Sequence, residues 1–235
     1  MSKFMFIHIP KTGGMTLDKD PRVAKQIQKC DPQFLRPFYA MEVKQAFDAY
    51  GLNYQFQHCR YKDVDMRWRN TRQFACLIRN PWDRTVSQYF FAKKISTEHG
   101  MTNETSVDPS ISFEDFLQLR YKWGKKPYFW HRTTVGYYPQ KVYVVDENGE
   151  QKVDALRFEE YDKDTMAYFN LETPIPKRNV SNGEVKDGKI TGRRDYRDLY
   201  SASTRDMIGE WYQADIDHFG FTFDGGATKN YWNKA

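Results

Sequence analysis

The chain has 235 residues, and its 36 Lys and Arg residues exceed its 31 Asp and Glu residues, which gives a formal net charge of +5 at pH 7. Hydrophobic residues make up 40% and aromatic residues 17% of the chain, which excludes a disordered protein. This length predicts a single globular domain over residues 1–235 with a sizeable core. The basic excess suits an anionic ligand, but nothing is typical of a nucleic-acid-binding module, so we expect no nucleic-acid partner.

The three cysteines, Cys30, Cys59 and Cys76, have neither the spacing of a disulfide framework nor that of a metal site. Cys76 lies in an apolar run and is expected to be buried. No separate apolar segment with a cleavage site precedes the first predicted strand, and no window approaches a membrane span. We therefore expect a cytoplasmic protein without a signal peptide or a membrane anchor.

A glycine turn follows the first apolar run of the chain. The run Phe4–Ile9 predicts a strand, which Pro10 ends because proline cannot donate to a β-ladder. The turn itself consists of Lys11, Thr12, Gly13 and Gly14. Adjacent glycines let the backbone bend sharply and gather N–H groups around an anion, and the lysine adds a positive charge at the rim. The residues that follow can open a helix, whose N-terminus favours the same anion.

This turn differs from the ATP-binding pattern, in which Lys and Ser/Thr follow the last glycine so that the hydroxyl can hold Mg²⁺. Here Lys11 precedes the glycines. A plain strand-to-helix turn with a surface lysine is the alternative interpretation of these residues.

The next segment predicts helices broken by prolines. The run Asp18–Pro21 should stop the helix after the glycine turn, because a residue before proline avoids the helical region. A second helix is predicted from Pro21 toward Cys30, and a third over Glu42–Tyr50.

The alternating run Tyr54–Cys59 predicts a second strand, with His58 near its carboxyl end. Ligands of open α/β sheets gather beyond the carboxyl ends of the strands. A lone histidine at such a place is more often structural or exposed than catalytic, so this position alone does not assign a role to His58.

The continuous apolar run Phe74–Ile78 predicts a strand in the middle of a parallel sheet. Asn80 is a good N-cap and Pro81 suits the first helical position, so a helix should begin there. Arg79 at the strand end and Ser87 two turns into the helix can then hold a phosphate together. A well-capped helix after a buried strand is the alternative.

The second half of the chain predicts further helices and a hairpin. Asn-Gly between two apolar runs is a strong hairpin signal. The predicted segments are a helix over Ser112–Tyr121, a hairpin of Val142–Val145 and Val153–Phe158, and helices over Asp162–Leu171 and Asp195–Phe219. The aromatic run Tyr128–Tyr138 is either an acceptor platform or, as we favour, a satellite core, and Val185–Arg194 is either a surface loop or a lid.

Three of these segments carry a family resemblance. The run F-I-H-I-P-K-T-G-G resembles the 5′-phosphosulfate loop of sulfotransferases that use 3′-phosphoadenosine 5′-phosphosulfate (PAPS), most closely the carbohydrate branch that includes the heparan sulfate 2-O-sulfotransferases. Met15 stands where that loop usually has a hydroxyl, and Thr16 keeps the next one. The run H-C-R-Y-K-D is similar to the family segment with the catalytic histidine, and R-N-P-x-x-R-x-x-S-x-Y is close to its 3′-phosphate motif. Arg84 also matches, with a bracing role as its alternative.

The resemblance implies an α/β fold, a P-loop-like three-layer sandwich with a central, mainly parallel sheet flanked by helices. It implies sulfuryl transfer from PAPS to an acceptor hydroxyl, on a carbohydrate, by in-line displacement without a metal. His58 would be the general base and Lys11 would stabilise the leaving phosphate. The implied nucleotide-binding residues are Lys11, Thr12, Gly13, Gly14, Met15, Thr16, Arg79, Ser87 and Ser181.

Two other functions stay open at this point. One is a P-loop nucleotide kinase, which the position of Lys11 and the lack of a G-K-[ST] sequence disfavour. The other is a non-catalytic nucleotide-binding protein with the same fold, supported by Met15 and by the helix break at Pro21. The sequence specifies neither the acceptor nor the oligomeric state.

Overall fold

A computed structural model gives the structure of the chain and describes residues 4–41, 44, 56–99, 107–124, 136–176, 184–186, 189–191 and 195–233. Most of the predicted helix Glu42–Tyr50, most of the aromatic run Tyr128–Tyr138, and Ser181 lie outside these ranges.

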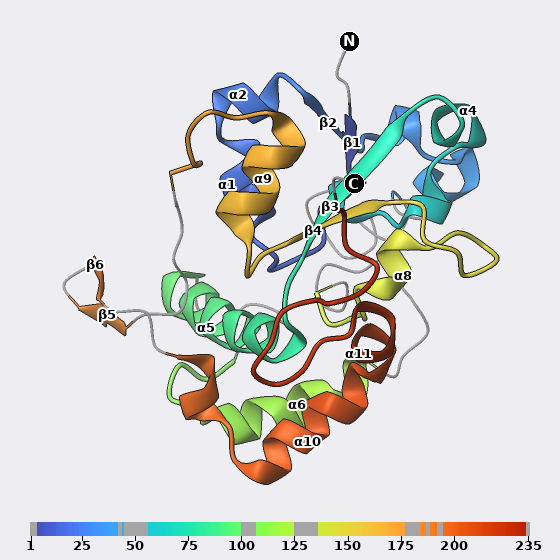
Figure 1. The fold of residues 1–235 in the computed structure, drawn as a ribbon. Helices are drawn as coiled ribbons and strands as arrows, with labels where there is room; N and C mark the ends of the chain where they lie inside the picture. Colours follow the sequence, from blue (N-terminus) through green and yellow to red (C-terminus); the bar gives the residue numbers. More distant parts are fainter. Residues whose placement is uncertain are drawn as a thin grey trace.

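A parallel four-stranded sheet forms the centre of the fold (Figure 1). Its strands are β1 (Phe4–Phe6), β2 (Ile27–Lys29), β3 (Gln73–Ile78) and β4 (Asp154–Arg157), in the spatial order β2-β1-β3-β4. Every neighbouring pair in this order is parallel. The carboxyl ends of the strands therefore lie along one edge, where the segments after β1 and β3 meet.

Both faces of the sheet are buried, because successive side chains of a strand point to opposite sides. Cys76 on β3 and Ala155 on β4 belong to one hydrophobic cluster, whereas Leu77 and Leu156 belong to the other. The predicted α/β fold with helices on both sides of a parallel sheet is thus confirmed.

One helical layer consists of short helices, which Figure 1 shows together on one side of the sheet. They are α1 (Gly14–Asp18), α2 (Pro21–Ala24) and α9 (Tyr161–Phe169). Asp20 caps α2 by accepting a 2.9 Å hydrogen bond from the backbone N–H of Arg22. The predicted break between α1 and α2 is confirmed, and it follows from this cap together with Pro21 at the first helical position.

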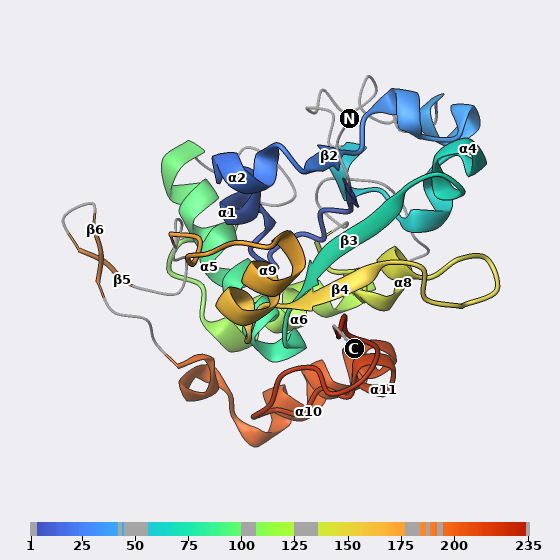
Figure 2. The ribbon, with the colours of Figure 1, turned by 45° about the horizontal axis from the view of Figure 1, so that its top comes forward.

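The other layer contains the two longest of the described helices together with three shorter ones, and Figure 2 shows it from a second direction. They are α5 (Pro81–His99), α6 (Phe113–Gly124), α8 (Lys141–Val144), α10 (Ala202–Trp211) and α11 (Gln213–Phe219). Asn80 Oδ1 accepts a 3.0 Å hydrogen bond from Trp82 N–H, which confirms Asn80 as the cap of α5. Among the described helices, none is both long and apolar enough to cross a membrane.

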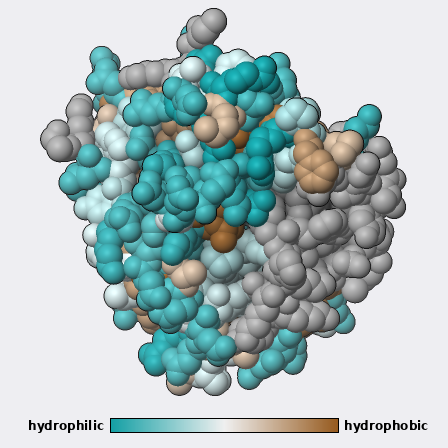
Figure 3. Space-filling model, turned by 90° about the vertical axis from the view of Figure 1, so that its right-hand side faces the viewer, coloured by the Kyte–Doolittle hydropathy of each residue, from teal (hydrophilic) through white to brown (hydrophobic). Residues whose placement is uncertain are grey.

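Short elements connect these layers. They are the 3₁₀ helices η1 (Pro32–Phe34), η2 (Phe56–His58), η3 (Tyr61–Asp63) and η4 (Tyr196–Leu199), the helix α4 (Met66–Arg69), and the antiparallel pair β5 (Glu184–Lys186) and β6 (Lys189–Thr191). The face in Figure 3 carries mainly hydrophilic residues, with a few hydrophobic ones between them.

The second strand predicted from the sequence is wrong. In the described part of Tyr54–Cys59, residues Phe56–His58 form the 3₁₀ helix η2, and Ile27–Lys29, predicted to be helical, form β2. Ile27–Lys29 takes the place in the sheet that was predicted for Tyr54–Cys59, because it pairs with every residue of β1. The η2 turn instead contacts the segment that follows β1, where His8 N–H donates to the carbonyl of Gln57 at 3.0 Å.

Two later predictions also need correction. The Asn148-Gly149 turn forms with Gly149 at φ 83°, but Lys141–Val144 before it is the helix α8 rather than a strand. The predicted helix Asp195–Phe219 is three segments, because Ser201 caps a new helix by accepting from Thr204 N–H.

Arg84 of α5 ties the helical layer to the end of β1. Its side chain is completely buried and donates to the carbonyls of Pro10 at 3.0 Å, Tyr138 at 2.9 Å and Gly136 at 2.8 Å. Arg84 is thus a brace for the chain before the glycine turn, and it acts through backbone carbonyls.

We expect Arg84→Met to lower the free energy of unfolding by about 3–5 kcal/mol, because buried carbonyls that lose a charged donor each cost about 1–3 kcal/mol. Urea unfolding would measure the loss. The control is Arg67→Met, which removes an exposed ion pair with Asp65 and should change stability by less than about 1 kcal/mol. Equal losses in the two variants would contradict the bracing role.

Candidate active site

The glycine turn follows β1 after residues 7–10, with its backbone in a conformation that most residues avoid. Lys11 has φ 67° and Gly13 has φ 96°. The buried Thr12 hydroxyl donates to the carbonyl of Ile9 at 2.8 Å, so this side chain fixes the turn. Gly14 begins α1, Thr16 lies in its first turn, and Met15 is 53% exposed.

Two aromatic rings explain why both turn residues are glycines. A Cβ atom at Gly13 would lie 2.9 Å from the ring of Phe158, and one at Gly14 would lie 2.7 Å from the ring of His8. Real Cβ atoms do not approach rings this closely, so side chains are excluded at both positions. The sequence predicted the turn, but these packing contacts are a second reason for its glycines.

Lys11 is a cation surrounded by few compensating charges. Burial, together with the nearby charges of Arg79 and Lys94, lowers the pKa of its amine to about 7. Its Nζ lies 4.0 Å from the ring centroid of Phe91 on α5. An anion next to Lys11 would stabilise the protonated amine and would be attracted by Arg79 as well.

Arg79 reaches the same turn from the end of β3. Its Nη1 donates to the carbonyl of Lys11 at 3.2 Å, and its guanidinium lies 4.1 Å from the ring centroid of Phe158. Nε and Nη2 form a buried ion pair with Asp83 at 2.8 and 2.7 Å. This pairing, which any phosphate at Arg79 would have to share, was not predicted from the sequence.

A side-chain amide fixes the backbone of Arg79. Gln140 accepts from Arg79 N–H at 2.9 Å and donates to the Arg79 carbonyl at 2.8 Å. The carboxylate of Asp215 on α11 accepts from the backbone N–H groups of Gln140 and Lys141, both at 2.8 Å. The end of β3 is therefore held from the C-terminal helix through buried hydrogen bonds.

His58 lies beside the glycine turn, although η2 rather than a strand carries it. Its Nδ1 is 2.5 Å from the carbonyl oxygen of His8, and its ring centroid is 4.9 Å from that of His8. A carbonyl can only accept, so Nδ1 carries the proton and the neutral ring keeps its lone pair on Nε2. This tautomer suits a proton acceptor.

The structure thus brings Lys11, Arg79 and the His8–His58 pair to one edge of the sheet. Ser87 is buried within α5, two turns after Arg79, and Ser181 lies outside the described residues. Within the described ranges, no group of three or more His, Cys, Asp or Glu residues is arranged to hold a metal ion.

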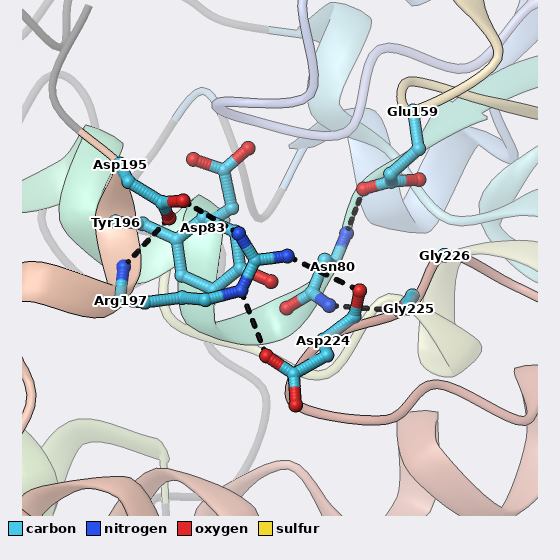
Figure 4. A pocket seen from close by; sticks show the side chains of 9 residues that line it. All are labelled: Asn80, Asp83, Glu159, Asp195, Tyr196, Arg197, Asp224, Gly225 and Gly226. Atoms are coloured by element: carbon cyan, nitrogen blue, oxygen red, sulfur yellow. Dashed lines mark hydrogen bonds and ion pairs between the residues drawn. The ribbon is translucent and has the colours of Figure 1, made fainter.

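A polar cavity of about 480 Å³ adjoins the Arg79–Asp83 pair (Figure 4). Its lining residues are Asn80, Asp83, Glu159, Asp195, Tyr196, Arg197, Asp224, Gly225 and Gly226. Figure 4 shows the Arg197 side chain between Asp195 and Asp224, and Glu159 accepting from the Asn80 backbone. Burial raises the pKa of Glu159. With four carboxylates and one guanidinium, this cavity disfavours a phosphate. Its residues come from distant parts of the chain, so sequence motifs did not predict it.

We expect Gly14→Ala to lower the free energy of unfolding by about 1–3 kcal/mol, because its Cβ would push into the His8 ring. Chemical denaturation is the measurement. In the control Gly209→Ala the new Cβ lies 3.5 Å from Trp82 inside α10, where alanine should stabilise the helix by up to about 1 kcal/mol. A neutral or stabilising Gly14→Ala would show that the turn has room for a side chain.

The chain matches no protein-family model and no curated protein. Among solved structures it is similar to a sulfotransferase from Alicyclobacillus acidocaldarius, with 14% sequence identity and a TM-score of 0.40, over 92% of this chain and 93% of that one.

Proposed function

We propose that this chain transfers a sulfuryl group from PAPS to a hydroxyl acceptor. The observation that carries the proposal is the meeting of three sequence motifs at one sheet edge. Arg79 bonds to the carbonyl of Lys11, and His58 bonds to the carbonyl of His8, three residues before Lys11. The resemblance of the same motifs to the PAPS-dependent family adds the reaction type, and its carbohydrate branch makes a sugar hydroxyl the proposed acceptor.

The turn suits the phosphosulfate end of PAPS. Lys11 and Arg79 are cations joined through the Lys11 backbone, and an anion next to Lys11 would stabilise its protonated amine. The glycines at positions 13 and 14 let the turn adopt its conformation, with Gly13 at φ 96°, and leave no side chain at either position. Arg79 with Ser87 would bind the 3′-phosphate, and part of the Arg79–Asp83 pair would have to open for this.

The chemistry follows from two groups. The acceptor oxygen forms a bond to sulfur while the bond from sulfur to the 5′-phosphate oxygen breaks. His58 Nε2 accepts the hydroxyl proton, a contribution typically worth about 10²–10⁴ in rate. Lys11 stabilises the negative charge that develops on the departing phosphate oxygen.

We expect His58→Ala to abolish transfer while binding of 3′,5′-adenosine bisphosphate persists, because the imidazole accepts the proton of the acceptor and does not bind the nucleotide. Radiolabelled PAPS with a panel of sugar, phenol and alcohol acceptors would measure transfer, and calorimetry would measure binding. The control is His218→Ala, which removes a histidine bound to Gln151 and should keep activity.

Each outcome of that experiment has a meaning. Full turnover in His58→Ala would remove His58 from the reaction. Tight bisphosphate binding by the wild type without transfer to any acceptor would favour a non-catalytic nucleotide-binding protein. Mg²⁺-dependent ATP hydrolysis would favour a nucleotide kinase.

We expect binding of 3′,5′-adenosine bisphosphate at pH 8 to take up a proton. Lys11, with a pKa of about 7 against an ordinary 10.5, is mostly neutral at that pH, and an adjacent phosphate would return it to the charged form. Affinity should therefore fall as the pH rises above 7. Calorimetry in two buffers of different ionisation enthalpy measures the uptake.

Lys11→Met should lose this proton uptake, whereas Lys152→Met, at a surface ion pair with Glu150, should keep it. The unliganded protein offers an internal check of the sign. The unfolded chain binds more protons than the folded chain between about pH 7 and 10.5, so Lys11 makes stability rise with pH across this window. Binding without proton uptake would place the anion away from Lys11.

A further inference from the structure

Asp18 is a buried carboxylate with an unused hydrogen-bonding atom. It ends α1, and its side chain is 7% exposed. Oδ2 forms an ion pair with Lys29 Nζ at 2.8 Å. Oδ1 is buried and has no hydrogen-bond partner among the described residues. Burying a carboxylate oxygen without a hydrogen bond lowers the stability of the fold, so this atom needs an explanation.

His8 connects this carboxylate to the proposed base. Its Nδ1 is 4.0 Å from Asp18 Oδ2, and its ring is 4.9 Å from the His58 ring. Burial, then the charges of Lys29 and Lys11, lower the pKa of His8 to about 4, so this imidazole is neutral at physiological pH. Three groups thus follow one another in space: the Asp18 carboxylate, the neutral His8 ring and the proposed proton acceptor His58.

The electrostatics agree with this arrangement. Burial raises the pKa of the Asp18 carboxyl, and the Lys29 ammonium and the His58 imidazole oppose that rise. Among the described residues, Asp18 interacts electrostatically with His58, Lys29 and Lys11 act on the neighbouring His8, and the Arg60–Asp63 ion pair lies on the segment after His58. Arg60 and Asp63 compensate each other, which leaves Asp18 as the carboxylate that can balance a protonated His58.

We propose that Asp18 is a positioning residue that stabilises the imidazolium formed when His58 accepts the acceptor's proton, with Lys29 limiting this effect through its ion pair to Asp18. The inference rests on the proposed function for the role of His58. The electrostatic interaction of Asp18 and Lys29 with His58 does not need a bound substrate, so it applies to the free protein as well.

The test is an NMR titration of the His58 ring protons, assigned by their loss in His58→Ala. An opposite charge favours the charged form, so Asp18→Asn should lower the His58 pKa by about one unit, and Lys29→Met should raise it. Asp206→Asn removes an exposed carboxylate on α10 and should leave it unchanged. The acid limb of kcat/KM should move with each titration, since it reports the base of the free enzyme.

The opposite signs separate electrostatics from structural damage. Shifts in the same direction for Asp18→Asn and Lys29→Met, or no shift in either, would overturn the proposal. Asp18→Glu keeps the charge and should keep the His58 titration near that of the wild type. If Asp18→Asn does not fold, Lys29→Met and Asp18→Glu still decide the question, because Lys29 is half exposed.

The inference and the proposed function fail in different ways. Absence of transfer to every acceptor would refute the proposed function, yet the titration would still measure whether Asp18 and Lys29 act on His58. Normal transfer with an unmoved His58 titration in Asp18→Asn would refute the inference alone.

Discussion

One hydrogen bond joins two segments that are far apart in the chain, from the Arg79 guanidinium to the carbonyl of Lys11. It is possible because β1 and β3 are parallel neighbours, with Phe4–Phe6 in register with Gln73–Ala75. Parallel strands end at the same edge, so whatever follows them is brought together. The site therefore depends on this strand pairing, and the brace from Arg84 to Pro10 keeps the shorter strand's exit in place.

Charge is divided across this edge. Lys11 and Arg79 form a positive region around the turn, while the cavity beyond Asp83 is lined by four carboxylates and one guanidinium. The Arg79–Asp83 pair lies at the border and belongs to both regions. An anion is thus attracted to one side of α5's N-terminus and repelled from the other.

Local patterns predicted the parts of the fold that local chemistry determines. The strand and helix around Arg79 follow from an apolar run, an Asn cap and a proline at the first helical position, all within about ten residues. The strand at Ile27–Lys29 was missed because pairing with β1, not its own sequence, makes it a strand. The same limit applies to the site, where Lys11, His58 and Arg79 stand in recognisable motifs. Their partners Asp83, Gln140 and His8 become visible only through contacts in space.

The C-terminal helices also contribute to this edge of the sheet. Asp215 of α11 holds the backbone at Gln140, and Gln140 in turn holds the backbone of Arg79. A shortened chain ending before Gln213 would retain all three motifs in its sequence and still lack the Asp215 carboxylate, which anchors the Arg79 motif through Gln140. The motifs alone therefore do not show which fragments of the chain would keep this arrangement at Arg79. A fragment that keeps it must extend through Asp215, well beyond the last of the three motifs.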